Sequence, residues 1–246
     1  MKLLDWTFPE AAANLACDEA LLDWRDAEFD DDILRFWEPR EHFVVLGYSS
    51  RIRADVELPR CVCLRVPVFR RCSGGGTVLQ GPGCLNFSLI LRLDASTRPA
   101  GLPTGLKEPE LLTTISGTTR LVMDTHRVAL ERLLGERVEV EGFSDLVRGG
   151  LKFSGNAQRR KRRAVLFHGT FLLDLDLRLV EELLSVPARQ PPHRRNRPHR
   201  EFLANLHVSS RLIKDALIGA WGAAEPLDGL PMDRIDAVAR EGYAPE

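Results

Sequence analysis

The sequence predicts an α/β fold, because segments with strand-like and helix-like periodicity alternate along its 246 residues. In the segment 85–93, apolar residues at every second position point to one side, while Asn86 and Ser88 point to the other. Helical spacing of apolar residues runs through 13–24 and again through 111–134, where Gly135 supplies a stop. A chain of this length can bury a full core.

Charge and composition narrow the class of protein. Lys and Arg total 34 against 35 Asp and Glu, so the net charge of -1 predicts no nucleic-acid or membrane partner. The five cysteines are odd in number and lack the paired spacing of a zinc site. No run approaches the roughly 18 apolar residues of a membrane helix, and no export signal begins the chain. We therefore expect a cytoplasmic protein with reduced thiols.

The remaining strand predictions centre on a hairpin. Strands are expected at 33–37, 43–46 and 61–66, and a further pair at 145–153 and 164–173, with 145–153 turning at Gly149 and Gly150. Strict alternation after that turn places Lys152 and Ser154 on one face and Leu151 and Phe153 on the other. In the same way, Leu166, His168 and Thr170 share a face. Polar groups thus line one side of two neighbouring strands.

Two stretches rich in arginine are expected on the surface. The run 159–163 (RRKRR) predicts a solvated, mobile loop, and 187–200 (PARQPPHRRNRPHR) predicts an irregular linker or partner-binding segment. The long helix 111–134 should bury Leu112, Ile115 and His126, the histidine as a packing residue. After residue 206 only about 40 residues remain, too few for a further domain, so we divide the chain into 1–206 and a short helical appendage, 207–246.

Chemistry is concentrated in two segments. In 70–78 (RRCSGGGTV), three glycines let the backbone present N–H groups to a phosphate, and Arg71 has the forked donor geometry that phosphates and carboxylates accept. The segment matches neither the dinucleotide fingerprint nor a P-loop. In 152–158 (KFSGNAQ), Lys152 offers an ammonium that can stabilise charge on a phosphoryl group under attack by a carboxylate.

Taken together, these segments resemble the lipoate–protein ligase family within the biotin and lipoate ligase superfamily. RRCSGGGTV and the LNFS at 85–88 are similar to that family's glycine-rich motif and its continuation. SDL at 144–146, KFSGNAQ at 152–158 and HGTFL at 168–172 are similar to its second set of motifs. Weaker similarity lies in NLA at 14–16 and VVLG at 44–47. The motifs occur in the family's order over roughly residues 10 to 206.

The resemblance implies a fold, an activity and a set of site residues. The fold is a mixed central β-sheet flanked by helices, related to the catalytic core of class II aminoacyl-tRNA synthetases, and residues 1–206 form the lipoate ligase-like catalytic domain. The activity is ATP-dependent formation of lipoyl-AMP, with Mg²⁺, and transfer of the lipoyl group to a lysine of a lipoyl-carrier domain. Lys152 is then the catalytic residue, and the dithiolane chain lies along an apolar tunnel. The residues implied in binding ATP or lipoyl-adenylate are Arg71, Ser73, Gly74, Gly75, Gly76, Thr77, Val78, Leu79, Asn86, Lys152, Ser154, Gly155, Asn156, Ala157, His168, Gly169 and Thr170.

Three departures from the family pattern leave alternatives open. Gln80 and Gly81 replace a common His-Asp pair, Cys84 replaces an asparagine, and the chain lacks the extra C-terminal domain of many bacterial ligases, so a separate accessory protein is one expectation. The first alternative activity is octanoyl or lipoyl transfer through a cysteine thioester without ATP. Residues 141–151 lack the cysteine that related transferases carry there, but Cys72 and Cys84 stand near the glycine-rich segment. The second alternative is a non-catalytic binder of acyl-adenylate or lipoyl domains.

Overall fold

The computed structural model describes residues 1–93 and 112–246. The helices are α1 (Ala11–Ala27), α2 (Ile52–Asp55), α3 (Leu58–Leu64), α4 (Ile115–Leu134), α5 (Leu177–Leu183), α6 (His199–Phe202), α7 (Ser210–Trp221) and α8 (Met232–Gly242), with a 3-10 turn at Pro192–Arg194. The strands are β1 (Lys2–Asp5), β2 (Ile33–Trp37), β3 (Phe43–Leu46), β4 (Val68–Arg70), β5 (Val78–Gln80), β6 (Cys84–Arg92), β7 (Glu139–Glu141), β8 (Asp145–Arg148), β9 (Leu151–Arg160), β10 (Ala164–Leu172) and β11 (Glu225–Pro226).

The strands form one large mixed sheet and one small sheet. The large sheet has the order β11-β1-β2-β6-β10-β9-β8-β7, and the small one the order β4-β3-β5. In the large sheet β1 is parallel to β2 and β11, while the other pairs are antiparallel. This confirms the expected α/β architecture with a mixed central sheet flanked by helices.

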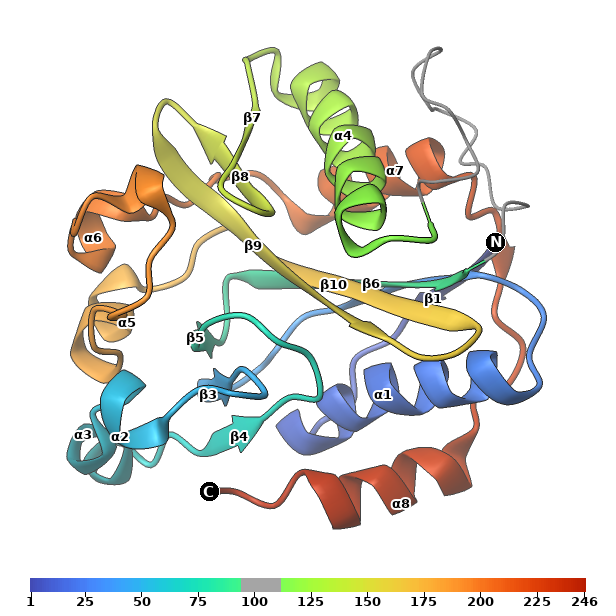
Figure 1. Cartoon of the computed structure of the whole chain (residues 1–246), viewed down its shortest axis with the longest axis horizontal. Helices are drawn as coiled ribbons and strands as arrows, with labels where there is room; N and C mark the ends of the chain where they lie inside the picture. Colours follow the sequence, from blue (N-terminus) through green and yellow to red (C-terminus); the bar gives the residue numbers. More distant parts are fainter. Residues whose placement is uncertain (94–111) are drawn as a thin grey trace.

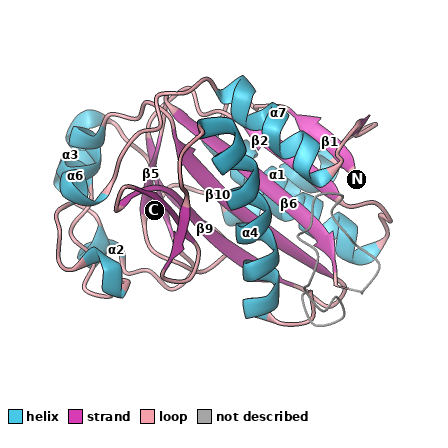
Figure 2. Cartoon of the chain, turned by 90° about the horizontal axis from the view of Figure 1, so that it is seen from above, coloured by secondary structure: helices cyan, strands magenta, loops and turns pink. Residues whose placement is uncertain are grey.

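Helices cover both faces of the large sheet. Helices α4 and α7 lie on one face, and α1 and α8 on the other, which they share with the small sheet (Figure 1). Seen from above, α4 crosses β9, β10 and β6 (Figure 2). The elements after residue 206 pack on this body: β11 pairs with β1, α7 contacts α4, and α8 contacts α1. None of the described helices is both long and apolar enough to cross a membrane.

The strand predictions hold with one exception. Strands at 33–37, 43–46, 84–92 and 164–172 are confirmed, as is the hairpin at Gly149 and Gly150, whose φ values are 58° and 79°. The strand expected at 61–66 is wrong, because residues 61–64 belong to helix α3 and the chain turns after them. Pro59 lies in the first turn of that helix, and Arg65 ends it in the left-handed conformation, with a φ of 55°. Only Cys61 of the helix is buried, so the apparent alternation does not reflect a sheet face.

Helix α4 begins later than expected. Thr114 caps it by accepting a hydrogen bond from the Gly117 N–H at 2.9 Å, and residue 111, where the helix was expected to start, lies outside the described residues. Ile115 is 64% exposed, so its assignment to the buried stripe is wrong. His126 is buried against aromatic rings, as predicted.

Two residues of the run 159–163, Arg160 and Lys161, bind other parts of the protein and are not free in solvent. Strand β9 extends through Arg160, whose guanidinium donates to the Leu112 carbonyl at 2.7 Å and to Thr118 Oγ1 at 2.9 Å. Lys161 forms an ion pair with Asp23 on α1. The prediction of a free cationic loop is therefore wrong for these two residues, which join the tip of the β9–β10 hairpin to both helical layers.

Candidate functional site

The glycine-rich segment 71–77 forms the loop between β4 and β5. Gly75 has a φ of +88°, which favours glycine. The end of β3 touches this loop, since a methyl group at Gly47 would lie 2.0 Å from the Gly75 carbonyl oxygen. On its other side, a Cβ at Gly75 would lie 3.7 Å from the Ala157 Cβ on β9. The loop is thus held between β3 and β9, and its contact with the end of β3 leaves no room for a side chain at Gly47.

Arg71 points into this loop. Its Nη2 donates to the carbonyl oxygens of Gly74 at 2.7 Å and Gly76 at 2.8 Å, and its Nε donates to Ser73 Oγ at 3.0 Å. Burial lowers the pKa of Arg71 to about 10, still well above neutrality. The guanidinium therefore stabilises the loop from within. Its donors bind oxygens of the loop itself, whereas the sequence suggested a forked pair of donors open to a phosphate or carboxylate.

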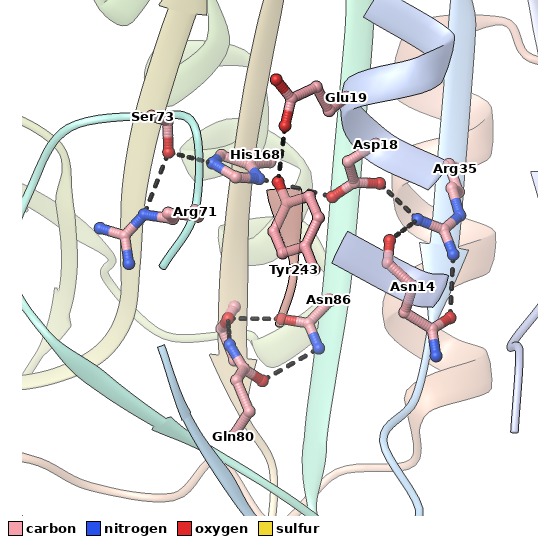
Figure 3. A network of polar contacts seen from close by, with 11 residues as sticks. Asn14, Asp18, Glu19, Arg35, Arg71, Ser73, Gln80, Asn86, His168 and Tyr243 are labelled. Atoms are coloured by element: carbon pink, nitrogen blue, oxygen red, sulfur yellow. Dashed lines mark hydrogen bonds and ion pairs between the residues drawn. The ribbon is translucent and has the colours of Figure 1, made fainter. Parts of the chain in front are cut away.

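A buried polar chain ties Ser73 to helix α1 (Figure 3). Ser73 Oγ lies 2.6 Å from His168 Nε2, and His168 Nδ1 lies 3.4 Å from Asp18 Oδ2. Asp18 forms an ion pair with Arg35, and Arg35 also donates to Asn14 Oδ1 at 2.9 Å. Burial would raise the pKa of Asp18, but the Arg35 charge and the His168 contact hold it below its usual range. The carboxylate is therefore ionised.

Gln80 closes a second polar group, a ring of three side chains also seen in Figure 3. Its Nε2 donates to Thr170 Oγ1 at 2.6 Å, Thr170 Oγ1 donates to Asn86 Oδ1 at 2.5 Å, and Asn86 Nδ2 donates back to Gln80 Oε1 at 3.0 Å. Gln80 and Asn86 are buried. At the neighbouring Gly81, a methyl group would lie 2.2 Å from the His42 ring. The departure from the family pattern is thus accommodated by mutually bonded neutral groups.

A β-bulge changes the face on which Lys152 lies. In the β8–β9 pair, Val147 faces Lys152 but Leu146 faces Ser154, so β9 carries one extra residue at this point. A methyl group at Gly155 would lie 2.9 Å from Lys152 Nζ. Lys152 therefore lies over Gly155, and the prediction that it shares a face with Ser154 is wrong.

Lys152 and the glycine-rich loop lie on the same face of β9. Gly155 and Ala157 alternate onto one face, where they pair with Thr170 and His168 of β10. The Lys152 side chain crosses Gly155, and Gly75 packs on Ala157. This face brings the two chemical segments of the sequence together.

Three of the expected site residues lie on the opposite face, toward α4. Ser154 pairs with Phe171 and Asn156 pairs with Gly169. A methyl group at Gly169 would lie 1.8 Å from Asn156 Oδ1 and 2.8 Å from Phe87 in the α4-side core. Asn156 Nδ2 donates to the Ser144 carbonyl at 2.5 Å, which fixes the turn before β8. These three residues thus pack on the α4 face of the sheet, opposite the face that carries Lys152 and the glycine-rich loop.

The other expected residues divide between loop and core. Gly74 and Gly76 have open space where a Cβ would stand, while Leu79 is buried among apolar residues. Val78 is half-buried against the core under α1. Thr77 Oγ1 donates to Asp55 Oδ2 at 2.8 Å, which ties the loop to α2.

The ammonium of Lys152 forms an ion pair with Asp145 and lies over the Phe202 ring. Its Nζ lies 2.7 Å from Asp145 Oδ1, and 5.9 Å from the centre of the Phe202 ring. Two arginines of the segment 187–200, Arg194 and Arg197, lie over the same ring at 4.8 and 5.3 Å. Arg194 is only 5% exposed, so the expectation of a wholly irregular surface segment is wrong. This segment builds the surroundings of Lys152.

The thiols near the glycine-rich loop are poorly suited to act as nucleophiles. Burial raises the pKa of Cys72 to about 12, and burial raises the pKa of Cys84 to about 12. A thiolate at neutral pH is therefore a rare form of either side chain. Within residues 1–93 and 112–246, no group of three or more His, Cys, Asp or Glu side chains is arranged to hold a metal ion.

Several residues of this site were missed in the sequence. Asp18 and Arg35 connect to Ser73 through His168, and Glu19 accepts a hydrogen bond from Tyr243 at 2.8 Å (Figure 3). The only signal of Asp18, Glu19 and Arg35 was a charge inside segments otherwise typical of buried helix and strand. A charge at such a position requires a partner, and that partner is not identifiable without the fold.

Comparisons with known proteins agree with this architecture. Residues 10–211 match the model of the lipoyl protein ligase A/B catalytic domain. The chain belongs to this family. It is 29% identical to octanoyltransferase LipM of Oceanobacillus iheyensis over 78% of this chain and 71% of the relative. It is 32% identical to a putative lipoate-protein ligase A of Aeropyrum pernix over 86% and 76%. The fold is shared with a crystal structure of lipoate-protein ligase A bound with ATP, at a TM-score of 0.75 and 24% identity, covering 98% of this chain and 92% of the other.

Proposed function

We propose that this enzyme is a lipoate–protein ligase, which activates lipoate with ATP and transfers the lipoyl group to a lysine of a lipoyl-carrier domain. The observation that carries the choice concerns the thiols. A thioester route needs a reactive cysteine, and the two thiols near the site have pKa values raised to about 12, while residues 141–151 contain none. The ligase route needs no thiol.

In this proposal two steps share one face of β9. A carboxylate oxygen of lipoate attacks the α-phosphorus of ATP and pyrophosphate leaves. The amine of the carrier lysine then attacks the acyl carbonyl, AMP leaves, and the amine loses a proton. Lys152 supplies positive charge to the oxygens that become more negative in the first step. The open backbone at Gly74 and Gly76 allows a phosphate to approach closely.

Magnesium would enter with the nucleotide and neutralise phosphate charge. The described residues offer no group of three acidic, histidine or cysteine ligands, which fits a metal carried by ATP better than a resident ion. The protein's own contribution is then the charge of Lys152 and the backbone of the glycine-rich loop.

The transferase remains the second candidate, for a specific reason. The Arg71 donors bind loop carbonyl oxygens, and several relatives with 25–29% identity are named octanoyltransferase LipM. A transferase would take the acyl group from a thioester and would not consume ATP.

Pyrophosphate exchange separates the two candidates. The chain alone, without any accessory protein, is incubated with lipoate, MgATP and labelled pyrophosphate. The ligase produces lipoate-dependent label in ATP, and Cys72→Ala with Cys84→Ala leaves that exchange within about twofold of the unchanged protein. No exchange, together with acyl transfer from octanoyl thioesters that the cysteine variants lose, would replace the ligase with the transferase. Absence of both reactions would leave either a ligase that requires a separate accessory protein or a binding protein.

A further inference from the structure

The residue after helix α8 reaches into the region beside the glycine-rich loop. Tyr243 is only 3% exposed, and its hydroxyl donates to Glu19 Oε2 on α1 at 2.8 Å. The same hydroxyl interacts with the Cys72 thiol, next to Ser73. Figure 3 shows the Tyr243 hydroxyl directed at Glu19. The residue after α8 thus places a buried aromatic ring beside the glycine-rich loop.

The residues after Tyr243 fix the position of its ring. The Glu246 backbone N–H donates to the Val68 carbonyl at 2.9 Å, and Glu246 Oε1 lies 2.6 Å from Arg70 Nε. At the other end of α8, Ile235 is buried in the core under α1. Residues 235–246 therefore cross from α1 to the strand that precedes the glycine-rich loop.

The chemistry of an acyl substrate places its two ends in different surroundings. The carboxyl end requires the polar and charged groups around Ser73, His168 and Lys152. The hydrocarbon tail requires apolar neighbours. Cys72, which precedes Ser73, and Val78 pack against a buried apolar cluster that includes Phe43, Val45, Phe69 and Tyr243.

We propose that Tyr243 is a specificity-determining residue whose ring closes the apolar end of the acyl site and so limits the length of chain that the enzyme accepts. This inference rests on the acyl site of the proposed function, and it applies to the ligase and the transferase alike. The hydrogen bond to Glu19 fixes the ring, and the tail from Tyr243 to Glu246 prevents the ring from moving aside.

Three substitutions at Tyr243 test this role, with hexanoyl, octanoyl and dodecanoyl donors offered in competition as acids with ATP and as thioesters. In Tyr243→Ala, the ratio of kcat/KM for dodecanoyl over octanoyl donors should rise about tenfold, the scale on which apolar pockets discriminate chain length. Tyr243→Leu keeps apolar packing but shortens the side chain, and should shift the ratio in the same direction if the alanine variant does not fold. Tyr243→Phe keeps the ring and should keep the original ratio.

A matched control lies on the same helix. Val238 packs on the same apolar cluster, so Val238→Ala loosens α8 without altering the Glu19 contact. An unchanged chain-length ratio in folded Tyr243→Ala and Tyr243→Leu proteins, or an equal shift in Val238→Ala, would overturn the role of Tyr243 while leaving the proposed function intact. An unsubstituted protein that uses no acyl donor of any length would instead remove the proposed function, and this inference with it.

Discussion

Ser73 Oγ lies 2.6 Å from His168 Nε2, so a single contact joins the glycine-rich loop to the central strand β10. Since Asp18 is an ionised carboxylate beside His168 Nδ1, the tautomer with hydrogen on Nδ1 is favoured. Nε2 then accepts the hydroxyl proton of Ser73, while Arg71 Nε donates to the same oxygen. The loop therefore depends on charges buried in α1 and β2 for its position.

Replacing His168 should loosen this loop. In His168→Ala, Ser73 loses its acceptor and the loop its link to β10. We expect kcat/KM for acyl transfer to fall about tenfold or more, since leaving a buried polar group unpaired costs about 1–3 kcal/mol. Hydrogen exchange of residues 71–77 should increase in the same variant. The exposed His207 provides the control, as His207→Ala should change neither measurement. Normal exchange in this loop of the His168→Ala protein would contradict the anchoring role.

Lys152→Ala tests the placement of the chemistry. Removing a preorganised charge from the transition state of adenylation typically costs about 10²-fold or more in rate. Lys152→Arg should restore little, because the guanidinium is larger and planar and cannot lie over Gly155 as the ammonium does. Single-turnover formation of lipoyl-adenylate is the measurement, with circular dichroism to confirm folding.

A second lysine gives the matched control for that experiment. Lys161 is also partly exposed and paired with an aspartate, Asp23, but lies at the far tip of the β9–β10 hairpin. Lys161→Ala should leave adenylate formation within about twofold of the unchanged protein. Equal losses in the two variants would mean that the Lys152 effect arises from hairpin stability and not from its charge at the site.

Sequence periodicity predicted most strands but misplaced Lys152. Alternation assumes a continuous ladder, and the bulge opposite Leu146 and Val147 shifts the following residues by one. The bulge has no glycine or proline of its own, so the sequence carried no sign of it. The family motif still selected Lys152, because a motif is independent of the face on which each residue lies.

The role of Arg71 was also beyond prediction from the sequence. An arginine beside three glycines suits a phosphate, but the same donors suit the carbonyl oxygens of a tight loop. Which partner is nearer depends on backbone geometry set by Gly75 and by contact with β3. Composition and motif order predict the fold class well, whereas the partner of Arg71 depends on the three-dimensional arrangement of the loop.

Some arginines of the segment 187–200 pack inside the protein, while others are exposed and available to a partner. Reversing charge at Arg194 or Arg197 would disturb the packing on Phe202 beside Lys152, so a loss of transfer there would be ambiguous. Arg189 and Arg195 are exposed and better suited to steer an acidic carrier domain.

Charge reversal at these two exposed arginines should affect only the second step. We expect Arg189→Glu with Arg195→Glu to lower the rate of acyl transfer to the carrier about tenfold at low salt, and less at high salt, because steering is screened. Adenylate formation should stay unchanged. Arg211→Glu, on an exposed position of α7, is the control. A similar loss in both half-reactions would show that this surface does not guide the carrier.

His126 makes the stability of the protein depend on pH. Burial lowers its pKa to about 3, below the value near 6.5 of an exposed histidine. The unfolded chain therefore binds a proton more readily than the folded one between these values. The stabilisation associated with a neutral His126 is complete above pH 6.5 and is lost as the pH falls toward 3, by at most about 1.4 kcal/mol for each pH unit.

A substitution that cannot titrate isolates this contribution. The ring lies against Phe87 and Trp221, with centroid distances of 4.6 and 5.9 Å, and neither ring nitrogen has a hydrogen-bond partner among the described residues. In His126→Phe, the free energy of unfolding from urea titrations should decline less steeply between pH 6.5 and 4.5 than in the unchanged protein. Because the site is apolar, stability at pH 7.5 should change by less than about 1.5 kcal/mol. Identical pH slopes in the two proteins would mean that His126 gains a proton in the folded state as easily as in the unfolded chain.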